Sequence, residues 1–474
     1  MDVSPEIRRP HIDRSTNDRL RAWLADPTDR PATVMGLGRH GGGLGITRYL
    51  ARRGAQITVS DQASEVSLQA SLAALGGLPL VAVRCGGHRS ADIQAAELLV
   101  VNPAVRPDHP LLDVARSHRV LITSEVEIFL NVQPCRVVAV TGTNGKSTTA
   151  AMVARVLESA GQRVWLGGNL GGSLLDALDR MSADDWVVIE LSSFQLSRLE
   201  QVPRPLDATI ITGCTPNHLD WHGSFSAYAA AKRRLLALQG PQTITVLDRQ
   251  DAQLRHWLPS VRGQAVAPWQ EQDLPPLEIV GAHQRRNACR AAAACEAIGV
   301  ERDVIEAALA TFRGLPDRLQ TIGHWAGRTF VNDTQSTTPE STIAALGSFT
   351  QPVWLLAGGA DKGAGFASLA DAIAARSRGV ALYGATARQI AAFLDDMPTR
   401  LSWEIFATLD EAFAWCWQRS VPGDVLLLSP GCSSLDQYAD CHQRGQHFRR
   451  LMEDFPSRKL ESAADGAASP PSST

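Results

Sequence analysis

The chain has 474 residues, enough for about three domains of roughly 150 residues each. Its hydrophobic content of 44% allows globular cores, and its net charge of −3 argues against nucleic acid held by bulk charge. No apolar run reaches about 18 residues, so no membrane span is expected. The charged N-terminus lacks the apolar core of a signal peptide, and eight scattered cysteines without a C-x-x-C pair are typical of reduced thiols in a cytoplasmic protein.

Short apolar strands alternate with helical segments, which predicts an α/β protein with mainly parallel sheets. The strands are expected at residues 33–35, 57–60 and 98–101 in a first domain, at 136–140, 186–189 and 208–211 in a second, and at 329–331, 353–357, 379–383 and 425–428 in a third. Turn formers near 133–134 and 314–316 mark the boundaries. The predicted domains are residues 1–133, 134–313 and 314–456, followed by an Ala/Ser/Pro-rich tail, 457–474, expected to be disordered.

A glycine-rich turn follows the first predicted strand. Residues 34–45 read Val-Met-Gly-Leu-Gly-Arg-His-Gly-Gly-Gly-Leu-Gly, a helix is expected at 46–53, and Asp61 follows the next strand. A βαβ unit with this turn binds a diphosphate at the helix N-terminus, and an acid about 20 residues further on binds the ribose. Taken alone, the turn suggests a nicotinamide cofactor.

A second glycine loop follows the strand at 136–140. Residues 141–148 read Thr-Gly-Thr-Asn-Gly-Lys-Ser-Thr, and a helix is expected at 149–158. Backbone N–H groups in such a loop point at phosphate. Lys146 would neutralise the β- and γ-phosphates, and Ser147 or Thr148 would hold Mg²⁺. The loop departs from the general Walker A pattern, because Val140 stands where that pattern has glycine.

This second loop resembles the ATP loop of the Mur ligases and of the folylpolyglutamate synthetases. Further Mur ligase motifs follow in the family's order, so that the resemblance covers about residues 30–453. They are Gly-Gly-Asn at 167–169, Glu-Leu-Ser-Ser-Phe-Gln-Leu at 190–196, Asn-His-Leu-Asp at 217–220, Ala-Lys at 231–232, Gly-Ala-His at 281–283 with Asn287, and Gly-Leu-Pro-Asp-Arg at 314–318. The resemblance implies a Rossmann-like N-terminal domain, a P-loop ATPase-like central domain and a Rossmann-like C-terminal domain.

The resemblance also implies ATP and Mg²⁺ as cofactors and assigns site residues. Catalytic roles are implied for Lys146, Glu190, His218 and Lys232, and Mg²⁺ binding for Ser147, Glu190, His218 and Lys232, the lysine as a carbamate. The implied ATP contacts are Gly142, Thr143, Asn144, Gly145, Lys146, Ser147, Thr148, Asn287, Arg318 and Asp333. The implied contacts of the UDP-linked substrate are Gly38, Arg39, His40, Asp61, Asn102 and Asn169. Those of the incoming amino acid are Thr337, Lys362, Ser434 and Leu435.

These motifs imply a monomeric, ATP-dependent ligase that joins glutamate to UDP-N-acetylmuramoyl-L-alanine through an acyl phosphate, in peptidoglycan precursor synthesis. Family members that add D-glutamate usually read Asp-Ser-Lys-Ala-Thr-Asn where this chain has Gln335 for the lysine, and Phe-Glu-x-Arg-Gly where it has Cys441-His-Gln-Arg-Gly445. A third departure is Gln284, where asparagine is common. Two departures fall around the amino-acid pocket, which fits a changed amino acid or a changed stereochemistry. The chain also resembles a variant of these ligases that adds L-glutamate, and this resemblance implies L-glutamate, with a separate epimerase acting on the product; D-glutamate is the alternative.

Two other functions remain open at this level. A folylpolyglutamate-type synthetase would share the ATP loop, but residues 190–196 and the glycine-rich first domain argue against it. A nucleotide-binding regulator without catalysis would not need Lys146, Glu190, His218 and Lys232 together.

Overall fold

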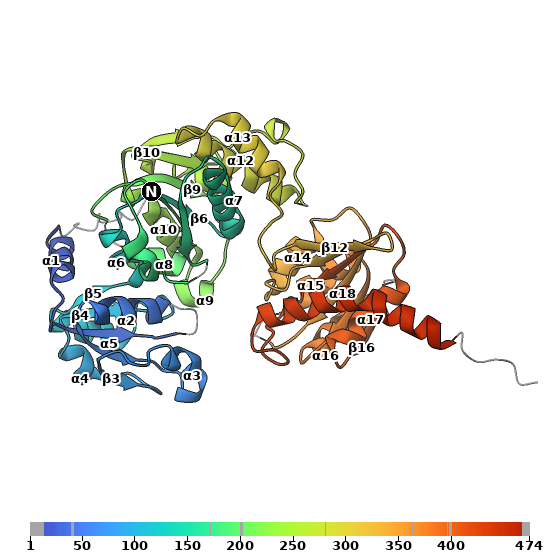
Figure 1. The fold of residues 1–474 in the computed structure, drawn as a ribbon, viewed down its shortest axis with the longest axis horizontal. Helices are drawn as coiled ribbons and strands as arrows, with labels where there is room; N and C mark the ends of the chain where they lie inside the picture. Colours follow the sequence, from blue (N-terminus) through green and yellow to red (C-terminus); the bar gives the residue numbers. More distant parts are fainter. Residues whose placement is uncertain are drawn as a thin grey trace, which may run out of the picture. The chain divides into compact units, whose positions relative to one another are not determined.

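The computed structural model describes residues 14–38, 42–170, 172–199, 202–279, 281–361, 365–395, 397 and 401–466 (Figure 1). The chain forms two compact units, one of Met1–Pro275 with Arg286–Leu309 and one of Pro276–Arg285 with Ala310–Thr474. The first unit contains two sheets and the second contains one. None of the helices among the described residues is both long and apolar enough to cross a membrane.

The first sheet is parallel throughout, with strand order β3-β2-β1-β4-β5, a Rossmann-like order. Its strands are β1 (Pro31–Met35), β2 (Gln56–Ser60), β3 (Leu80–Arg84), β4 (Leu98–Val101) and β5 (Leu121–Thr123). Its helices are α1 (Arg14–Ala25), α2 (Gly42–Arg52), α3 (Glu65–Ala73), α4 (Ser90–Gln94), α5 (Pro110–Ser117) and α6 (Glu125–Val132). Alternate residues of β1 and β4 pack to opposite faces, against α1, α2 and α6 on one and against α4 and α5 on the other.

The second sheet is also parallel, with order β11-β10-β9-β6-β8-β7. Its strands are β6 (Arg136–Thr141), β7 (Val164–Gly168), β8 (Trp186–Glu190), β9 (Leu206–Ile211), β10 (Gln239–Leu247) and β11 (Gln264–Val266). Its helices are α7 (Lys146–Ser159), α8 (Ser193–Arg198), α9 (Leu219–His222), α10 (Phe225–Arg233), α11 (Ala252–Arg255), α12 (Ala282–Ala297) and α13 (Arg302–Ala310). The central strand β6 lies between β8 and β9, so its carboxyl end is a position where such sheets bind ligands.

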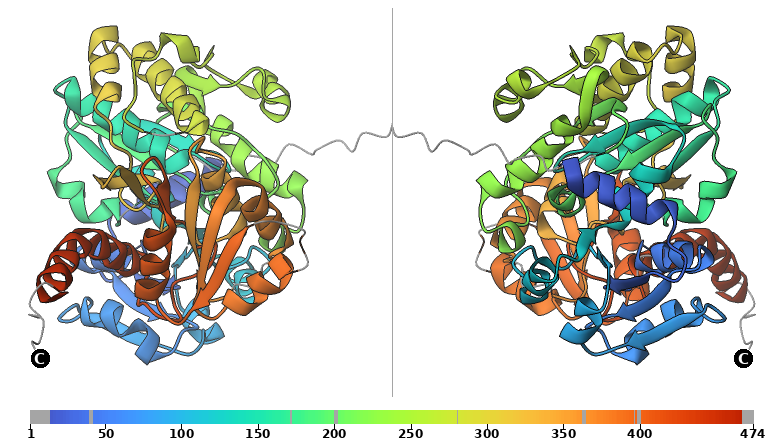
Figure 2. Two further views of the ribbon diagram at one scale, coloured as in Figure 1. Left: turned by 90° about the vertical axis from the view of Figure 1, so that its right-hand side faces the viewer. Right: turned by 90° about the vertical axis from the view of Figure 1, so that its left-hand side faces the viewer.

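The third sheet has order β12-β13-β17-β14-β15-β16, and only the β12–β13 pair is antiparallel among the described strands. Its strands are β12 (Gln320–Trp325), β13 (Arg328–Asn332), β14 (Val353–Gly358), β15 (Ser377–Tyr383), β16 (Ser402–Phe406) and β17 (Val425–Leu428). Its helices are α14 (Pro339–Leu346), α15 (Ala367–Arg376), α16 (Ala387–Asp395), α17 (Leu409–Arg419) and α18 (Cys441–Gly466). Figure 2 shows this sheet in orange; α14, α15 and α16 pack on one face, α17 and α18 on the other.

The strands predicted at 98–101 and 425–428 match the structure to the residue, and the others end within two residues of it. Both helices predicted after glycine loops begin earlier, at Gly42 and Lys146, because the loops turn directly into helix. Helix α18 continues to Gly466, so residues 457–466 are helical where composition predicted disorder. The boundary predicted at 133–134 falls between α6 and β6, whereas Pro276–Arg285 belongs with the second unit, which the sequence did not indicate.

Candidate active site

The loop between β6 and α7 has two positions that only glycine fits. Gly142 has φ 153° and Gly145 has φ 81°. A Cβ on Gly142 would lie 1.9 Å from Thr212 Oγ1, and one on Gly145 would lie 2.3 Å from Asn287 Oδ1. The loop therefore packs closely against the end of β9 and against α12. Its backbone, rather than its side chains, would line a bound phosphate.

Hydrogen bonds hold this loop in one conformation, the one in which it would bind a phosphate. The Thr143 amide donates to the Gly213 carbonyl at 2.9 Å, and the Thr143 hydroxyl is hydrogen-bonded to Tyr228 Oη at 3.0 Å. Lys146 Nζ donates to the Thr143 carbonyl at 2.9 Å, so the lysine folds back over the loop. With Ser147 buried in the first turn of α7, the loop, the cation and the helix N-terminus together suit a nucleotide triphosphate.

Glu190 ends β8 beside this loop, and its side chain is 1% exposed. Its Oε1 accepts a hydrogen bond from Asn169 Nδ2 at 2.9 Å, while its Oε2 has no hydrogen-bond partner among the described residues. A buried carboxylate oxygen without a partner is costly, and a divalent cation would satisfy it. Glu190 therefore fits Mg²⁺. Asn169, predicted to contact the UDP-linked substrate, is placed by the structure as the residue that orients Glu190.

Lys232 is buried, at 2% exposure, although its alanine-rich helix taken alone predicts a solvated lysine. Its Nζ donates to the Gly142 carbonyl at 2.6 Å and lies 4.6 Å from the centre of the Tyr228 ring. Burial and, to a smaller extent, the charge of Lys146 lower the pKa of Lys232 to about 7, against the opposing effect of Glu190. The structure thus brings Lys146, Glu190 and Lys232 together at one end of the sheet.

His218 lies at the edge of this group. It is exposed, has φ 52°, and precedes α9. Its ring centre lies 4.8 Å from that of Phe194 and 6.4 Å from that of Tyr228, which places it near α8 and α10. In the described part of the chain, no three His, Cys, Asp or Glu side chains are grouped as a metal site. A metal site that includes Lys232 would require the lysine to become anionic, so the Mg²⁺ ligand set remains a prediction.

The glycine-rich turn of the first domain is held by the residues expected around a UDP group. The Gly38 amide donates to Asp61 Oδ2 at 2.9 Å, and Asn102 Nδ2 donates to the Gly36 carbonyl at 3.2 Å. A Cβ on Gly36 would lie 2.5 Å from Asn102 Cβ, so the turn needs glycine there. Gly38, Asp61 and Asn102 therefore meet at the carboxyl ends of β1, β2 and β4, whereas the predicted contacts Arg39 and His40 lie outside the described residues.

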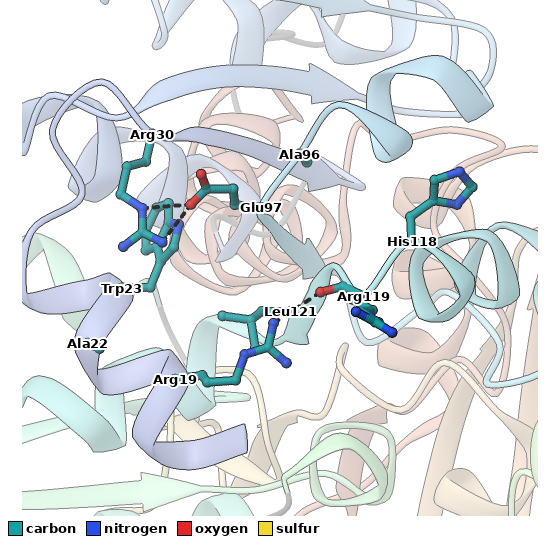
Figure 3. Close-up of a pocket in the computed structure, with 9 residues that line it drawn as sticks. All are labelled: Arg19, Ala22, Trp23, Arg30, Ala96, Glu97, His118, Arg119 and Leu121. Atoms are coloured by element: carbon teal, nitrogen blue, oxygen red, sulfur yellow. Dashed lines mark hydrogen bonds and ion pairs between the residues drawn. The ribbon is translucent and has the colours of Figure 1, made fainter. Parts of the chain in front are cut away.

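A cavity of about 380 Å³ lies elsewhere in the first domain (Figure 3). Arg30, which pairs with Glu97 at 2.6 Å, lines it together with Arg19 and Arg119. Arg30 and Glu97 directly precede β1 and β4, so the cavity is at the amino ends of the strands, opposite the glycine-rich turn. It is therefore separate from the predicted nucleotide site.

Two predicted ATP contacts, Arg318 and Asp333, lie in the second unit. Asp333 is buried; its Oδ1 accepts from the Leu319 amide at 3.0 Å, and its Oδ2 accepts from Ser429 Oγ at 2.7 Å. Burial raises the pKa of Asp333 to about 6, against these hydrogen bonds and the charge of Arg318. Asp333 thus organises its own unit in this conformation, and its contact with ATP remains a prediction.

The predicted amino-acid contacts also lie in the second unit. Ser434 is buried, Leu435 is 59% exposed and Thr337 is partly buried, while Lys362 lies outside the described residues. Ala360 and Ser433 exchange backbone hydrogen bonds of 2.8 and 3.0 Å, which pairs the segment before Lys362 with the one that carries Ser434. These two predicted segments therefore do lie side by side.

Comparisons with known proteins identify the family. A model described as "Mur ligase MurD-like, N-terminal domain" matches residues 30–124, "Mur ligase middle domain" matches 140–270, and "Mur ligase, glutamate ligase domain" matches 317–432. A UDP-N-acetylmuramoylalanine–D-glutamate ligase from Roseiflexus sp. is 36% identical, over 90% of this chain and 98% of that protein. The chain belongs to the Mur ligase family. A second relative with the same name, from Acidobacterium capsulatum, is 34% identical over 88% of this chain and 95% of its own.

Solved structures agree with the Mur ligase fold. The UDP-N-acetylmuramate–alanine ligase of Thermotoga maritima has a TM-score of 0.56 at 19% identity, covering 90% of this chain and 99% of that one. FolC of E. coli, solved with ADP, has a TM-score of 0.51 at 16% identity, covering 70% of this chain and 92% of that one. At such identities these two structures are evidence for the fold alone. The predicted family and fold class are confirmed, and this Mur ligase is an ATP-dependent enzyme of peptidoglycan synthesis.

Proposed function

We propose that this Mur ligase joins the amine of glutamate to the alanyl carboxylate of UDP-N-acetylmuramoyl-L-alanine, with conversion of ATP to ADP and phosphate. The observation that carries the proposal is the grouping of the part-buried Lys146 with the buried Glu190 and Lys232 around the β6–α7 loop. The names of the relatives support the two substrates. We further propose that the enzyme is cytoplasmic, because its cysteines are free, and that it acts as a monomer.

Amide formation from a carboxylate needs a leaving group better than oxide. The alanyl carboxylate takes the γ-phosphoryl group and ADP leaves; the glutamate amine then attacks the acyl carbon, loses a proton and expels phosphate. Two anions must meet in the first step, so the site has to supply positive charge. Lys146 lies where it would neutralise the transferred phosphoryl group once its contact with the Thr143 carbonyl gives way to phosphate.

Mg²⁺ would neutralise phosphate oxygens and polarise the phosphoryl group. The residues proposed to hold it are Ser147, Glu190, His218 and a carbamylated Lys232. Only a neutral amine reacts with CO₂, and the lowered pKa of Lys232 makes the neutral form available near neutral pH. The carbamate would convert this cation into an anion beside the loop.

The relatives' names favour D-glutamate as the amino acid, and we propose it as the first candidate. L-glutamate, the enantiomer predicted from the sequence, is the second candidate, with a separate epimerase acting on its product. One observation favours it: Thr334 Oγ1 donates to the Cys441 carbonyl at 2.8 Å. The segments that carry Gln335 and Cys441, two departures from the D-glutamate pattern, are therefore in contact, so the departures modify one place.

The test is ADP release by the purified chain with Mg²⁺. Release should require UDP-N-acetylmuramoyl-L-alanine and glutamate together, and mass spectrometry should find the glutamyl product. Release that requires a folate substrate instead would support a folylpolyglutamate-type synthetase. ATP binding without release under any of these conditions would support a non-catalytic regulator. Either result would refute the proposal.

A further inference from the structure

Arg444 is fully buried in the second unit, on the first turns of α18. Its Nε donates to Thr334 Oγ1 at 3.0 Å and its Nη2 to the Thr334 carbonyl at 2.9 Å; Nη1 and Nη2 both reach the Cys432 carbonyl at 3.3 Å. Each of these acceptors is a neutral oxygen. Burying a guanidinium among neutral groups is costly, and here its hydrogen bonds to two backbone segments offset part of that cost.

The segments that Arg444 joins are those expected to recognise the amino acid. Thr334 precedes Gln335 and Thr337, and Cys432 precedes Ser434. The third segment is the turn at Gly359, where a Cβ would lie 3.2 Å from Arg444 Nη1. One side chain of α18 thus forms hydrogen bonds to two of these loops and lies close to the third.

The residue two positions before Arg444 fixes a fourth segment. His442 Nδ1 lies 2.6 Å from Asp317 Oδ2, and the aspartate side chain is 4% exposed against 62% for the histidine. Asp317 Oδ1 accepts from Asn332 Nδ2 at 2.8 Å, and the Asp317 carbonyl accepts from the Gln335 amide at 3.2 Å. Asp317 therefore connects α18 with the end of β13 and with the loop that carries Gln335.

The hydrogen bonds of His442 indicate that Asp317 needs an N–H donor at position 442. Gln446 Nε2 lies 2.9 Å from His442 Nε2, so an imidazole with its proton on Nδ1 can donate to Asp317 and accept from Gln446. Asp317 also has φ 64°, a strained conformation that needs support from its neighbours. A carboxylate at position 442, as in the Phe-Glu-x-Arg-Gly pattern, would instead place two anions in contact.

We propose that His442 is a positioning residue for the incoming amino acid, acting through Asp317 on the loop of Gln335–Thr337. The inference rests on the proposed function, because it takes that loop as part of the glutamate site. It differs from a general stabilising role in what it predicts: loss of the His442–Asp317 contact should affect the KM for glutamate more than that for ATP or the stability of the fold.

Three variants test the contact. His442→Glu should raise the KM for glutamate by about tenfold or more, since it sets a carboxylate against a buried carboxylate. His442→Asn keeps an N–H donor close to the place of Nδ1, so its KM should stay within about threefold of the wild type. The exchange variant Asp317→His/His442→Glu restores an opposite pair and should recover most of what His442→Glu loses, as a double-mutant cycle.

A matched control is His447→Ala, which removes a second histidine–aspartate pair of the same helix, 3.2 Å from Asp410. It should leave the KM for glutamate unchanged. Melting temperature and the KM for ATP are measured for every variant. The inference fails if His442→Glu keeps the wild-type KM for glutamate, if His442→Asn is as impaired as His442→Glu, or if the KM for glutamate, the KM for ATP and the melting temperature change in parallel. Absence of glutamate-dependent ADP release from the wild type would instead refute the proposed function.

Discussion

Lys232 Nζ donates a hydrogen bond to the carbonyl oxygen of Gly142 at 2.6 Å, so a buried lysine of α10 contacts the loop that opens α7. The contact explains how one side chain can affect phosphate binding without lying in the loop. It also places the lysine beside the loop that we propose binds the nucleotide.

Lys232→Ala should abolish ligase activity, because the proposed carbamate is lost. Acetate or formate at high concentration should restore part of it by occupying the vacated anionic position. The measurement is ADP release with and without added carboxylate, and the wild type with the same salts is the control. Activity of Lys232→Ala equal to the wild type without rescue would contradict the proposed carbamate.

Lys146→Ala should remain folded and lose several orders of magnitude in turnover, since each 1.36 kcal/mol of lost transition-state stabilisation is about tenfold in rate. The expected cause is loss of the cation beside the transferred phosphoryl group. Single-turnover ADP formation at saturating ATP separates this effect from weaker binding. Near-normal turnover would exclude the assigned role of the β6–α7 loop.

Two glycine substitutions separate backbone strain from collision in the loop. Gly145 and Gly161 have similar φ, 81° and 76°, so alanine at either costs about 1–2 kcal/mol of strain. Only at Gly145 does a Cβ meet another group, Asn287 Oδ1 at 2.3 Å, whereas at Gly161 nothing lies within 4 Å. Gly145→Ala should therefore weaken ATP binding strongly and Gly161→Ala should not, by titration calorimetry. Equal effects of the two would show that strain alone matters.

The parts of the site that sequence predicted well are local. The β6–α7 loop could be placed because strand, glycines and lysine lie within a dozen residues, and the phosphate-binding geometry follows from that order. Strand positions followed from β-branched runs because both faces of a parallel sheet are buried.

The parts that it missed depend on contacts between distant segments. The hydrogen bond from Asn169 to Glu190 could not be predicted, because it depends on the pairing of β7 with β8; the assignment of Asn169 to the UDP-linked substrate stays a prediction. Nothing in the Ala-rich sequence around Lys232 indicates burial, since that depends on where α10 packs. Apart from its motif, no feature of the local sequence indicates the contacts of Arg444, because its hydrogen-bond partners lie 12 and 110 residues away.

The pH dependence of stability should contain a contribution from Glu125 of α6. Its carboxylate accepts from Ser173 Oγ at 2.6 Å, and burial raises its pKa to about 7, against that hydrogen bond and with a smaller contribution from Asp176. The folded state thus holds the proton more tightly than the unfolded state, whose pKa is near 4.5. Stability from this group is complete below about pH 4.5 and is lost as the pH rises through about 7.

The side chain of Glu125→Gln cannot ionise, so the variant loses none of this stability as the pH rises. The difference in melting temperature, variant minus wild type, should therefore increase from pH 5 to pH 8. One kcal/mol corresponds to about 2–4 °C in a unit of this size. The exposed variant Glu158→Gln is the control and should show a constant difference. A difference for Glu125→Gln that is also independent of pH would show that Glu125 titrates normally.

The choice of enantiomer can be tested at Gln335, where the pattern of the D-glutamate-adding ligases has a lysine. Gln335 is partly buried, and its amide donates to the Asp317 carbonyl, so its position is tied to His442. Enantiomers exchange the directions of amine and carboxylate around the same carbon. A pocket that neutralises the charged groups of one enantiomer leaves a charged group of the other enantiomer unpaired, at a cost of several kcal/mol.

Gln335→Lys adds a cation at this position and should raise the ratio of kcat/KM for D-glutamate to that for L-glutamate by about tenfold or more. The wild-type ratio is measured side by side with UDP-N-acetylmuramoyl-L-alanine, and the relatives' names predict that D-glutamate is preferred. A wild-type preference for L-glutamate would overturn the first candidate in favour of the second and leave the ligase assignment intact.

The control is a Gln→Lys substitution elsewhere in the second unit. Gln320→Lys is not suitable, because Gln320 Oε1 accepts a hydrogen bond from the Asp317 amide. Gln418→Lys is suitable, because Gln418 is exposed on α17 and lies in none of the segments assigned to the amino acid, so its ratio should not move. An unchanged ratio in Gln335→Lys would show that the departure at this position does not set the enantiomer, and that the hand is read elsewhere in the second unit.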